Sequence, residues 1–420
     1  MAATPSAPRA GAAKLSDAVP RTVLAGDGFR GLACVGVLVI HAAIVTLLFK
    51  HHPGFNPDIE APWQYKPVVG ILSPLMMLMN ATIFVFFVLS GYLLSRGFVA
   101  AYVLGTPKPS IKRYARNRVL RIVPGFWLVL AIFLTWDHAW SAGGAGGLLA
   151  TFAFAQNYHS TPAAVIAQAW TLNIETAFYI ALPIVAVLAM ATGRLRPATP
   201  AGRLRLVLGA LLVLFVGSLL LRFDAGNPAG KTFNLAQFMF AFAPGIALGA
   251  IEPFAAPRVR DASNGVLLSR VLLALAAAMF IAFVVAPTQD ERILLESLGC
   301  GALVAAAVTL QWATGGGWRV LTNRPARWIG ERSYGLYLIH LGLMGHIMQR
   351  IGESHGYPET FVVLAIAALV ASLVAADLIW RFVERPVLSW RLPWRQAEFA
   401  GASAPEPEPA SQPADSAVGA

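Results

Sequence analysis

The sequence predicts an all-α fold: a polytopic transmembrane helix bundle with about ten spanning helices plus one short re-entrant or interfacial segment. Composition is the first reason, because 57% of the 420 residues are hydrophobic and only 13% are charged, roughly half the charged share of soluble proteins. The second reason is a series of apolar runs, each long enough to cross a bilayer ~30 Å thick. The third is that the basic residues gather between alternate runs.

Ten apolar runs reach the roughly 17–25 residues that a membrane span needs. They begin near Gly31, Val68, Leu120, Gln168, Leu204, Leu235, Val266, Ile293, Ser333 and Phe361. A further apolar stretch, residues 146–155, is too short to cross and is rich in glycine at its start. We expect this stretch to be re-entrant or to lie at the membrane interface.

The basic residues set the orientation of these runs. With the N-terminus in the cytoplasm, the inside segments hold roughly 26 Lys and Arg and the outside segments about 6. If residues 146–155 crossed, every later loop would flip and this bias would disappear. The excess of Arg over Lys and the abundance of Ala are typical of a GC-rich bacterial genome. We therefore expect a multi-pass protein of the bacterial cytoplasmic (inner) membrane, in contact with membrane lipids, with both termini cytoplasmic.

The two ends of the chain differ from its apolar middle. Residues 1–26 are rich in Ala, Pro and Ser without the apolar core of a signal peptide, and residues 396–420 are Pro-rich and mildly acidic, so both are predicted to be disordered and cytoplasmic. Residues 27–395 form the predicted transmembrane domain. The net charge of +11 does not indicate nucleic-acid binding, because the basic residues lie between apolar runs. Cys34 and Cys300 lie inside apolar runs and are expected to be buried, with neither a disulfide nor a metal site.

Residues 27–41, DGFRGLACVGVLVIH, combine a cation at the mouth of the first run with a histidine inside it. Helical geometry brings Arg30 and His41 within roughly 20° of one another around the axis and about 16 Å apart along it. Both are therefore expected to face one cavity or groove. An ionisable residue midway across a membrane is a candidate for function, although a structural hydrogen bond to a neighbouring helix explains a lone histidine equally well.

The third run is entered by a dense basic segment, IKRYARNRVLRIVPGF. Arg118 and Arg121 are three residues apart and share a helix face, with Arg116 close by. Such a segment is typical of a topology signal that holds anionic lipid head groups. The alternative is a phosphate clamp, because the planar guanidinium matches phosphate oxygens. Pro124 is expected to let the following helix begin or kink.

Two later runs also carry polar residues. In WTLNIETAFYIALP, Glu175 and Tyr179 are four apart and share a face, while Trp170 stands at the expected outer interface. Glu175 is expected to bond another helix, to orient a catalytic histidine or to hold a hydroxylated substrate. In SYGLYLIH, Tyr337 and His340 lie on one side of a helix. The FVERP segment is expected to end the last helix with a local ion pair between Glu384 and Arg385.

The ordered set of these motifs resembles the acyltransferase-3 family of bacterial integral-membrane O-acyltransferases. The resemblance covers residues 22–390 and rests on Arg-ten-residues-His, FFVLSGYLL, RNRVLRIVPGF, WTLNIETAFYIALP, SYGLYLIH and FVERP. It implies that Arg30 and His41 are essential and that Arg118 and Arg121 match the family's Arg-x-x-Arg, associated with the acyl-CoA donor. Glu175 would match its intramembrane glutamate. Thr171 stands where a serine is common, which preserves the hydroxyl.

The resemblance and the helical spacing together predict an enzyme that moves an acyl group, acetyl in the first instance, from acyl-CoA to a hydroxyl of a carbohydrate, glycolipid or related acceptor. No permanently bound cofactor is expected. Arg30, Arg116, Arg118 and Arg121 would hold the phosphates of acyl-CoA (acetyl-CoA), and the thioester would reach His41. His41, Glu175 and Arg30 are the predicted catalytic residues; the predicted substrate contacts are Trp170, Tyr179, Tyr337 and His340.

Two mechanisms fit these residues, with His41 acting as a general base or carrying the acyl group itself. Two other classes of protein also fit the composition. A transporter or flippase of a lipid-linked sugar would move its substrate without acyl-CoA and would usually carry repeat symmetry, which inspection of the sequence does not reveal. A membrane sensor or scaffold would tolerate replacement of Arg30 and His41.

Overall fold

The computed structural model describes residues 23–49, 73–136, 144–158, 166–192, 197–223, 233–260, 263–352 and 356–390. Within these ranges every regular element is a helix, which confirms the all-α prediction. The two termini predicted to be disordered lie outside the described residues, apart from residues 23–26.

The helices follow one another along the chain with short connections. In order they are α2 (Gly26–Phe49), α4 (Ser73–Leu104), α5 (Ile111–Trp136), α6 (Gly144–Phe152), α7 (Trp170–Ala191), α8 (Pro200–Phe223), α9 (Leu235–Val259), α10 (Ser263–Val285), α11 (Gln289–Thr314), α12 (Arg319–Thr322), α13 (Arg324–Ile351), α14 (Tyr357–Ile379) and α15 (Arg385–Ser389). Short turns precede or join some of them: η4 (Gln156–Tyr158), η5 (Ala167–Ala169) and η7 (Trp380–Glu384).

Nine of the described helices are long and apolar enough to cross a membrane, namely α2, α4, α5, α7, α8, α9, α10, α11 and α14. The sequence predicts about ten, and the tenth run lies in α13. This helix has 28 residues and so measures about 42 Å, but its polar and charged residues set it apart from the nine. Helix α6, with nine residues, is too short to cross, as expected for residues 146–155.

Two helices begin well before the apolar runs that predicted them. Helix α5 starts at Ile111 rather than near Leu120, and α13 starts at Arg324 rather than at Ser333. Pro124 therefore lies inside α5 and does not begin it. Arginine is a good helix former, so a basic segment outside the hydrocarbon continues the same helix. The consequence is that Arg118 and Arg121 are held on a rigid element.

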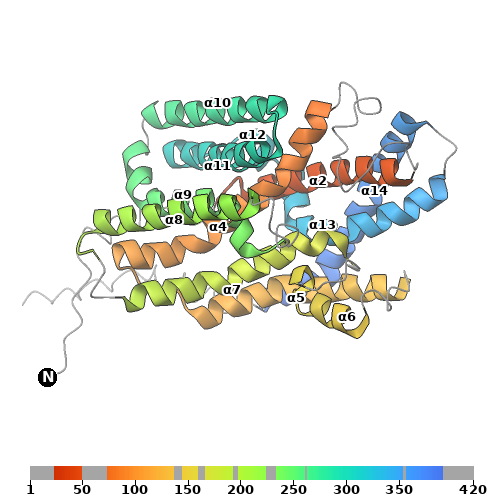
Figure 1. Cartoon of the computed structure of the whole chain (residues 1–420), viewed down its shortest axis with the longest axis horizontal. Coiled ribbons are helices and arrows are strands. Elements are labelled where there is room, and N and C mark those ends of the chain that lie inside the picture. Colours follow the sequence, from red (N-terminus) through yellow and green to blue (C-terminus); the bar gives the residue numbers. More distant parts are fainter. Residues whose placement is uncertain are drawn as a thin grey trace, which may run out of the picture.

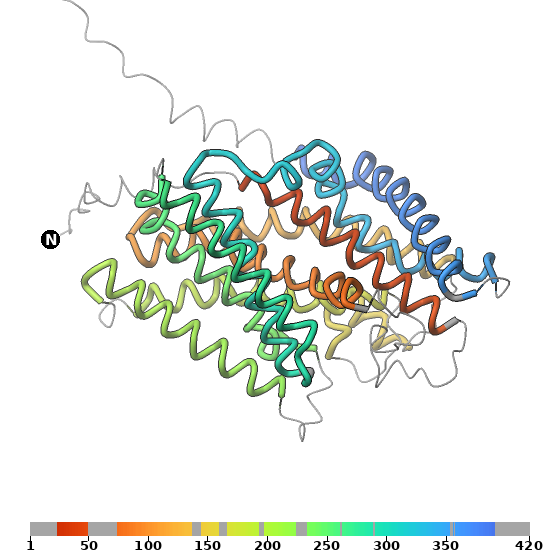
Figure 2. Tube along the Cα trace, turned by 90° about the horizontal axis from the view of Figure 1, so that it is seen from above, coloured from red at the N-terminus to blue at the C-terminus, as the bar shows by residue number. Residues whose placement is uncertain are grey.

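Helix α2 is the centre of one half of the bundle. It packs against α13, α4 and α14, and α13 also packs on α14 and α5. Figure 1 shows α13 and α14 beside α2, with α5, α6 and α7 grouped along the lower side of the bundle. The view in Figure 2 shows the red tube of α2 running next to the blue tubes of α13 and α14. Five helices thus surround the residues that the sequence singles out.

The crossing of α2 and α13 is close enough to exclude side chains. A Cβ atom on Gly330 would overlap the carbonyl oxygen of Asp27, and one on Gly28 would overlap the carbonyl of Leu321. Glycine is the residue that permits backbones to approach in this way within a membrane bundle. The close approach brings the first turns of α2, including Arg30, beside the middle of α13.

The other half of the bundle consists of α8, α9, α10 and α11, with α4 between the halves. Helix α4 packs on α9, α2 and α11, and α10 packs on α11. Phenylalanines fill the α4–α9 contact, among them Phe87, whose ring lies 5.1 Å from that of Phe242. Gly91 on α4 admits the backbone of α9, because a Cβ there would overlap the carbonyl of Phe242. This apolar wall forms one side of the site described next.

Candidate functional site

A cavity of about 440 Å³ lies between α2, α4, α5, α7 and α13. It is lined by Arg30, Ile83, Phe86, Phe87, Arg118, Arg121, Thr171, Leu172, Glu175, Tyr179, Ser333, Tyr334 and Tyr337. The lining combines three arginines and a glutamate with tyrosines and apolar residues. The structure therefore gathers in one cavity six residues that the sequence predicts for the site: Arg30, Arg118, Arg121, Glu175, Tyr179 and Tyr337.

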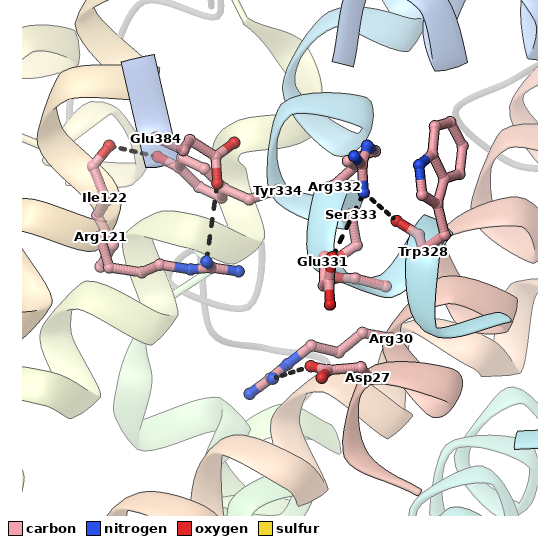
Figure 3. Close-up of polar contacts among 11 residues, drawn as sticks. Asp27, Arg30, Arg121, Ile122, Trp328, Glu331, Arg332, Ser333, Tyr334 and Glu384 are labelled. Carbon is pink, nitrogen blue, oxygen red and sulfur yellow. Dashed lines mark hydrogen bonds and ion pairs between the residues drawn. The ribbon is translucent and has the colours of Figure 1, made fainter. Parts of the chain in front are cut away.

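The three arginines reach the cavity from two helices. Arg118 and Arg121 come from one face of α5, and Arg30 comes from the first turns of α2. Figure 3 shows Arg30 and Arg121 extending into a shared space from opposite sides. Three guanidinium groups against one wall make this a strongly positive chamber.

These cations have weak partners within the protein. Arg30 forms an ion pair with Asp27 at 3.4 Å, and Arg121 lies 3.7 Å from Glu384. Arg118 lies over the ring of Tyr179, 5.8 Å from its centroid, and its buried Nε atom has no hydrogen-bond partner among the described residues. Ion pairs at 2.7–2.9 Å are the strong ones, so the cavity holds cationic capacity that the protein itself leaves unused.

Glu175 is held in the same cavity by two hydroxyl groups. Tyr179, one turn further along α7, donates to its Oε2 at 2.6 Å. Ser90 of α4 donates to its Oε1 at 3.2 Å. The carboxylate is thus fixed in orientation by α4 and α7, as the shared face of Glu175 and Tyr179 predicts, while no guanidinium within the described residues hydrogen-bonds it.

A set of hydrogen bonds closes the far end of the cavity. The hydroxyl of Tyr337 donates to the carbonyl of Gln168 at 2.8 Å and lies 2.7 Å from the hydroxyl of Thr171. The Gln168 amide in turn donates to the carbonyl of Leu338 at 2.6 Å. These bonds tie the start of α7 to α13. Sequence reasoning did not single out Gln168, although an amide at the head of an apolar run was a usable signal.

The two intramembrane histidines form a pair beyond this end. Nδ1 of His41 lies 2.9 Å from Nε2 of His340, and Nδ1 of His340 lies 2.8 Å from the carbonyl oxygen of Tyr337. The rings are tilted by 34° with centroids 5.0 Å apart. His41 is not among the residues that line the cavity, whereas Arg30 is. The expectation that both face one cavity therefore holds for Arg30, and His41 lies next to Tyr337 through His340.

Two predicted residues lie away from the cavity. Arg116 is exposed and donates to the carbonyl of Trp390 at 3.4 Å. It stands two positions before Arg118, and a step of two residues points to the other side of a helix. Trp170 packs on the rings of Phe233 and Phe238, at centroid distances of 4.6 and 5.5 Å.

The last helix departs from the expected stop. At FVERP the chain continues through the π-helical turn η7 into α15, so the helix does not end there. Glu384 is 3% exposed and pairs with Arg121 of α5, while the guanidinium of Arg385 lies over the ring of Trp380. The expectation of a local ion pair between Glu384 and Arg385 was wrong. A π turn re-aims side chains within a helix, and here it accompanies a Glu384 that meets the arginine segment (Figure 3).

Comparison with known proteins gives one family and several relatives. A family model described as an acyltransferase domain, Acyl_transf_3, matches residues 24–381. The peptidoglycan O-acetyltransferase OatA of Listeria monocytogenes serovar 1/2a is 23% identical over 381 residues, covering 86% of this chain and 55% of its own. The putative peptidoglycan O-acetyltransferase YrhL of Bacillus subtilis is 24% identical over 331 residues, covering 72% of this chain and 49% of its own.

The O-acetyltransferase OatA of Staphylococcus aureus (strain NCTC 8325 / PS 47) is 21% identical over 394 residues, covering 88% of this chain and 57% of its own. The chain thus spans about half the length of the curated relatives it matches. No solved structure matches it.

Proposed function

The chain belongs to the acyltransferase-3 family of acyltransferase domains, and from this premise we propose that it is a membrane O-acyltransferase. It moves an acyl group, acetyl in the first instance, from acyl-CoA to a hydroxyl of a carbohydrate acceptor. Relatives named as peptidoglycan O-acetyltransferases support both the acetyl group and the glycan acceptor. The proposed setting is the bacterial cytoplasmic membrane, with both termini in the cytoplasm.

The observation that carries this proposal is the cavity with three arginines, Arg30, Arg118 and Arg121. Coenzyme A carries a pyrophosphate and a further phosphate on its ribose, and arginine forks bind phosphate oxygens in pairs. An anion of that kind would satisfy the guanidinium groups that lack close partners in the protein. The phosphates would lie among the arginines, with the pantetheine arm directed toward Thr171 and Tyr337.

The distance along α2 supports the same arrangement. Arg30 and His41 are separated by about 16 Å along the helix axis, which is of the order of the pantetheine arm. The thioester would therefore reach the region of Tyr337 and His41. Tyr179 and Tyr337 line the path and would contact the arm or the acyl group. We assign no direct contact with substrate to Arg116 or Trp170.

His41 carries the proton transfer in this proposal. The acceptor hydroxyl attacks the thioester carbonyl, a C–O bond forms and the C–S bond breaks. The hydroxyl proton passes to His41 and then to the thiolate of coenzyme A. Transfer through an acyl-histidine uses the same nitrogen in two steps. A positioned general base contributes typically 10²–10⁴-fold to rate. Glu175, fixed by Ser90 and Tyr179, balances the charge of the arginines beside the reacting thioester.

Purified full-length protein in lipid nanodiscs tests the donor. We expect coenzyme A and acetyl-CoA to bind, and pantetheine, which lacks the phosphates, to bind far more weakly. In membranes of cells that express the gene, glycans should gain the mass of an acetyl group. His41→Ala should abolish that gain, with His346→Ala as the control on α13. Equal binding of pantetheine and coenzyme A would reject the phosphate site.

The same experiment separates an enzyme from a transporter or flippase of a lipid-linked sugar. A transporter would move its substrate in the absence of acetyl-CoA and would leave glycan masses unchanged. Retention of acetyl transfer by His41→Ala would reject the proposed role of that histidine.

A further inference from the structure

His340 and His41 form a hydrogen-bonded chain whose direction can be read from its end group. From the geometry of this chain we infer that His340 is a positioning residue: it holds His41 in the tautomer that has its proton on Nδ1 and a free lone pair on Nε2. The inference rests on the proposed function, since it names the nitrogen of His41 that reacts. It gives His340 a role other than the substrate contact expected from the sequence.

The first step is the contact between His340 and its own helix. Nδ1 of His340 lies 2.8 Å from the carbonyl oxygen of Tyr337. A carbonyl oxygen only accepts hydrogen bonds. Nδ1 of His340 must therefore carry a proton and donate it to this carbonyl.

The second step is the charge of His340. The side chain is 1% exposed. Its surroundings on α2, α13 and α14 are apolar and include Leu38, Leu336 and Met344. Among the described residues no carboxylate forms an ion pair with either imidazole. A buried charge without a partner is costly, so His340 is neutral and its Nε2 is an acceptor.

The third step passes this constraint to His41. Nε2 of His340 and Nδ1 of His41 lie 2.9 Å apart, which is a hydrogen-bond distance. Because Nε2 of His340 accepts, Nδ1 of His41 donates. A neutral imidazole has only one proton, so Nε2 of His41 keeps its lone pair. The hydrogen bond made by one ring nitrogen thus sets the state of the other.

The chemical consequence is the same for both mechanisms. A lone pair on Nε2 takes the proton of an acceptor hydroxyl or attacks the thioester directly, whereas Nε2–H does neither. Without a partner at Nδ1 the ring would be free to rotate and to take either tautomer. His340 therefore removes two sources of unproductive His41: the wrong orientation and the wrong proton position.

Nitrogen NMR of the purified full chain in nanodiscs, labelled with ¹⁵N-histidine, tests the inference without relying on activity. The His41 signals are assigned as those lost in His41→Ala. We expect a protonated Nδ1 and an unprotonated Nε2 at neutral pH. A protonated Nε2 on His41 in the wild-type protein would overturn the inference, even if the protein transfers acetyl groups normally.

Two substitutions at His340 extend the test to catalysis. His340→Leu should lower turnover by about 10²-fold or more with little change in KM for acetyl-CoA, and His41 should show both tautomers. His340→Gln offers an amide oxygen near the position of Nε2, so it should retain turnover within about tenfold and keep the Nδ1–H signal. His346→Leu, a histidine elsewhere on α13, is the matched control and should change neither readout.

The outcomes separate this inference from the proposed function. If His41→Ala retains acetyl transfer, the proposed function fails whatever the NMR spectrum shows. If His41→Ala is inactive but His340→Leu and His340→Gln lose turnover equally with the His41 tautomer unchanged, the positioning role is rejected and the acyltransferase proposal stands.

Discussion

Two buried carboxylates, Glu252 and Glu175, face arginines in very different ways. Glu252 of α9 is 2% exposed and receives both Nε and NH2 of Arg96, at 2.7 and 3.0 Å. Tyr92 and Trp312 also donate to it, at 2.7 and 3.1 Å. Glu175 receives only two hydroxyl groups, although arginines line the same cavity.

The difference teaches which cations belong to the architecture. The cluster around Glu252 joins α4, α9 and α11, and each charge is compensated at short distance. Such a network is rigid and has no capacity for a ligand. In the cavity, Arg30 and Arg121 have only long ion pairs and Arg118 has an unpaired Nε among the described residues. An anionic ligand would complete what the protein leaves incomplete, which fits a phosphorylated donor.

The largest effect should come from breaking the compensated cluster. Glu252→Gln keeps the volume of the side chain but leaves Arg96 without its counter-charge in an apolar setting, which should cost about 3–5 kcal/mol of stability. The measurement is the midpoint of thermal unfolding of the purified protein. Coenzyme A affinity of the protein that remains folded should be unchanged. A midpoint equal to that of the wild type would end the distinction drawn between the two carboxylates.

Glu175→Gln should show the opposite pattern. The amide still accepts from Ser90 and Tyr179, and no guanidinium loses a direct bond, so the unfolding midpoint should stay close to the wild-type value. Acetyl transfer should fall by about 10²-fold because the negative charge beside the thioester is lost. Turnover is measured with acetyl-CoA in membranes. A variant that unfolds early and turns over normally once folded would show that Glu175 is architectural.

Sequence patterns predicted the elements of this contrast better than their partners. All ten apolar runs correspond to helices, because a span is a property of one segment of chain. The spacing within one helix also places Arg118 with Arg121, and Glu175 with Tyr179, on shared faces that line the cavity. Helix starts were less accurate, since α5 and α13 extend into basic segments that a hydropathy pattern does not count.

Contacts between helices were out of reach for the same reason. The pairing of His41 with His340 and of Arg121 with Glu384 depends on how two helices are rotated against each other. That rotation is set by packing, such as the glycine contact between α2 and α13, and no local pattern encodes it. The compensated Arg96–Glu252 pair was missed for this reason too.

Arg118→Ala should have a smaller effect that is confined to binding. Its guanidinium has no carboxylate partner within the described residues, so its loss should not lower the unfolding midpoint. Coenzyme A should bind about tenfold more weakly, the usual scale for one charged hydrogen bond. Arg113→Ala, an exposed arginine on the same helix, is the control. Arg121→Ala sharpens the comparison, because it should weaken binding and also destabilise the protein by leaving buried Glu384 unpaired.

The smallest effect concerns salt, and it tests the cavity without a substitution. Phosphates held by arginines at a solvent-accessible mouth are partly screened, since the Debye length falls from about 10 Å at 0.1 M to about 3 Å at 1 M ionic strength. Coenzyme A affinity should therefore fall several-fold over this range, while the weak binding of pantetheine should not. The Arg96–Glu252 pair is buried, so the unfolding midpoint should change little over the same range. If salt weakens pantetheine and coenzyme A equally, the arginines are not reading phosphate, and the contrast between a compensated and an uncompensated cluster loses its functional meaning.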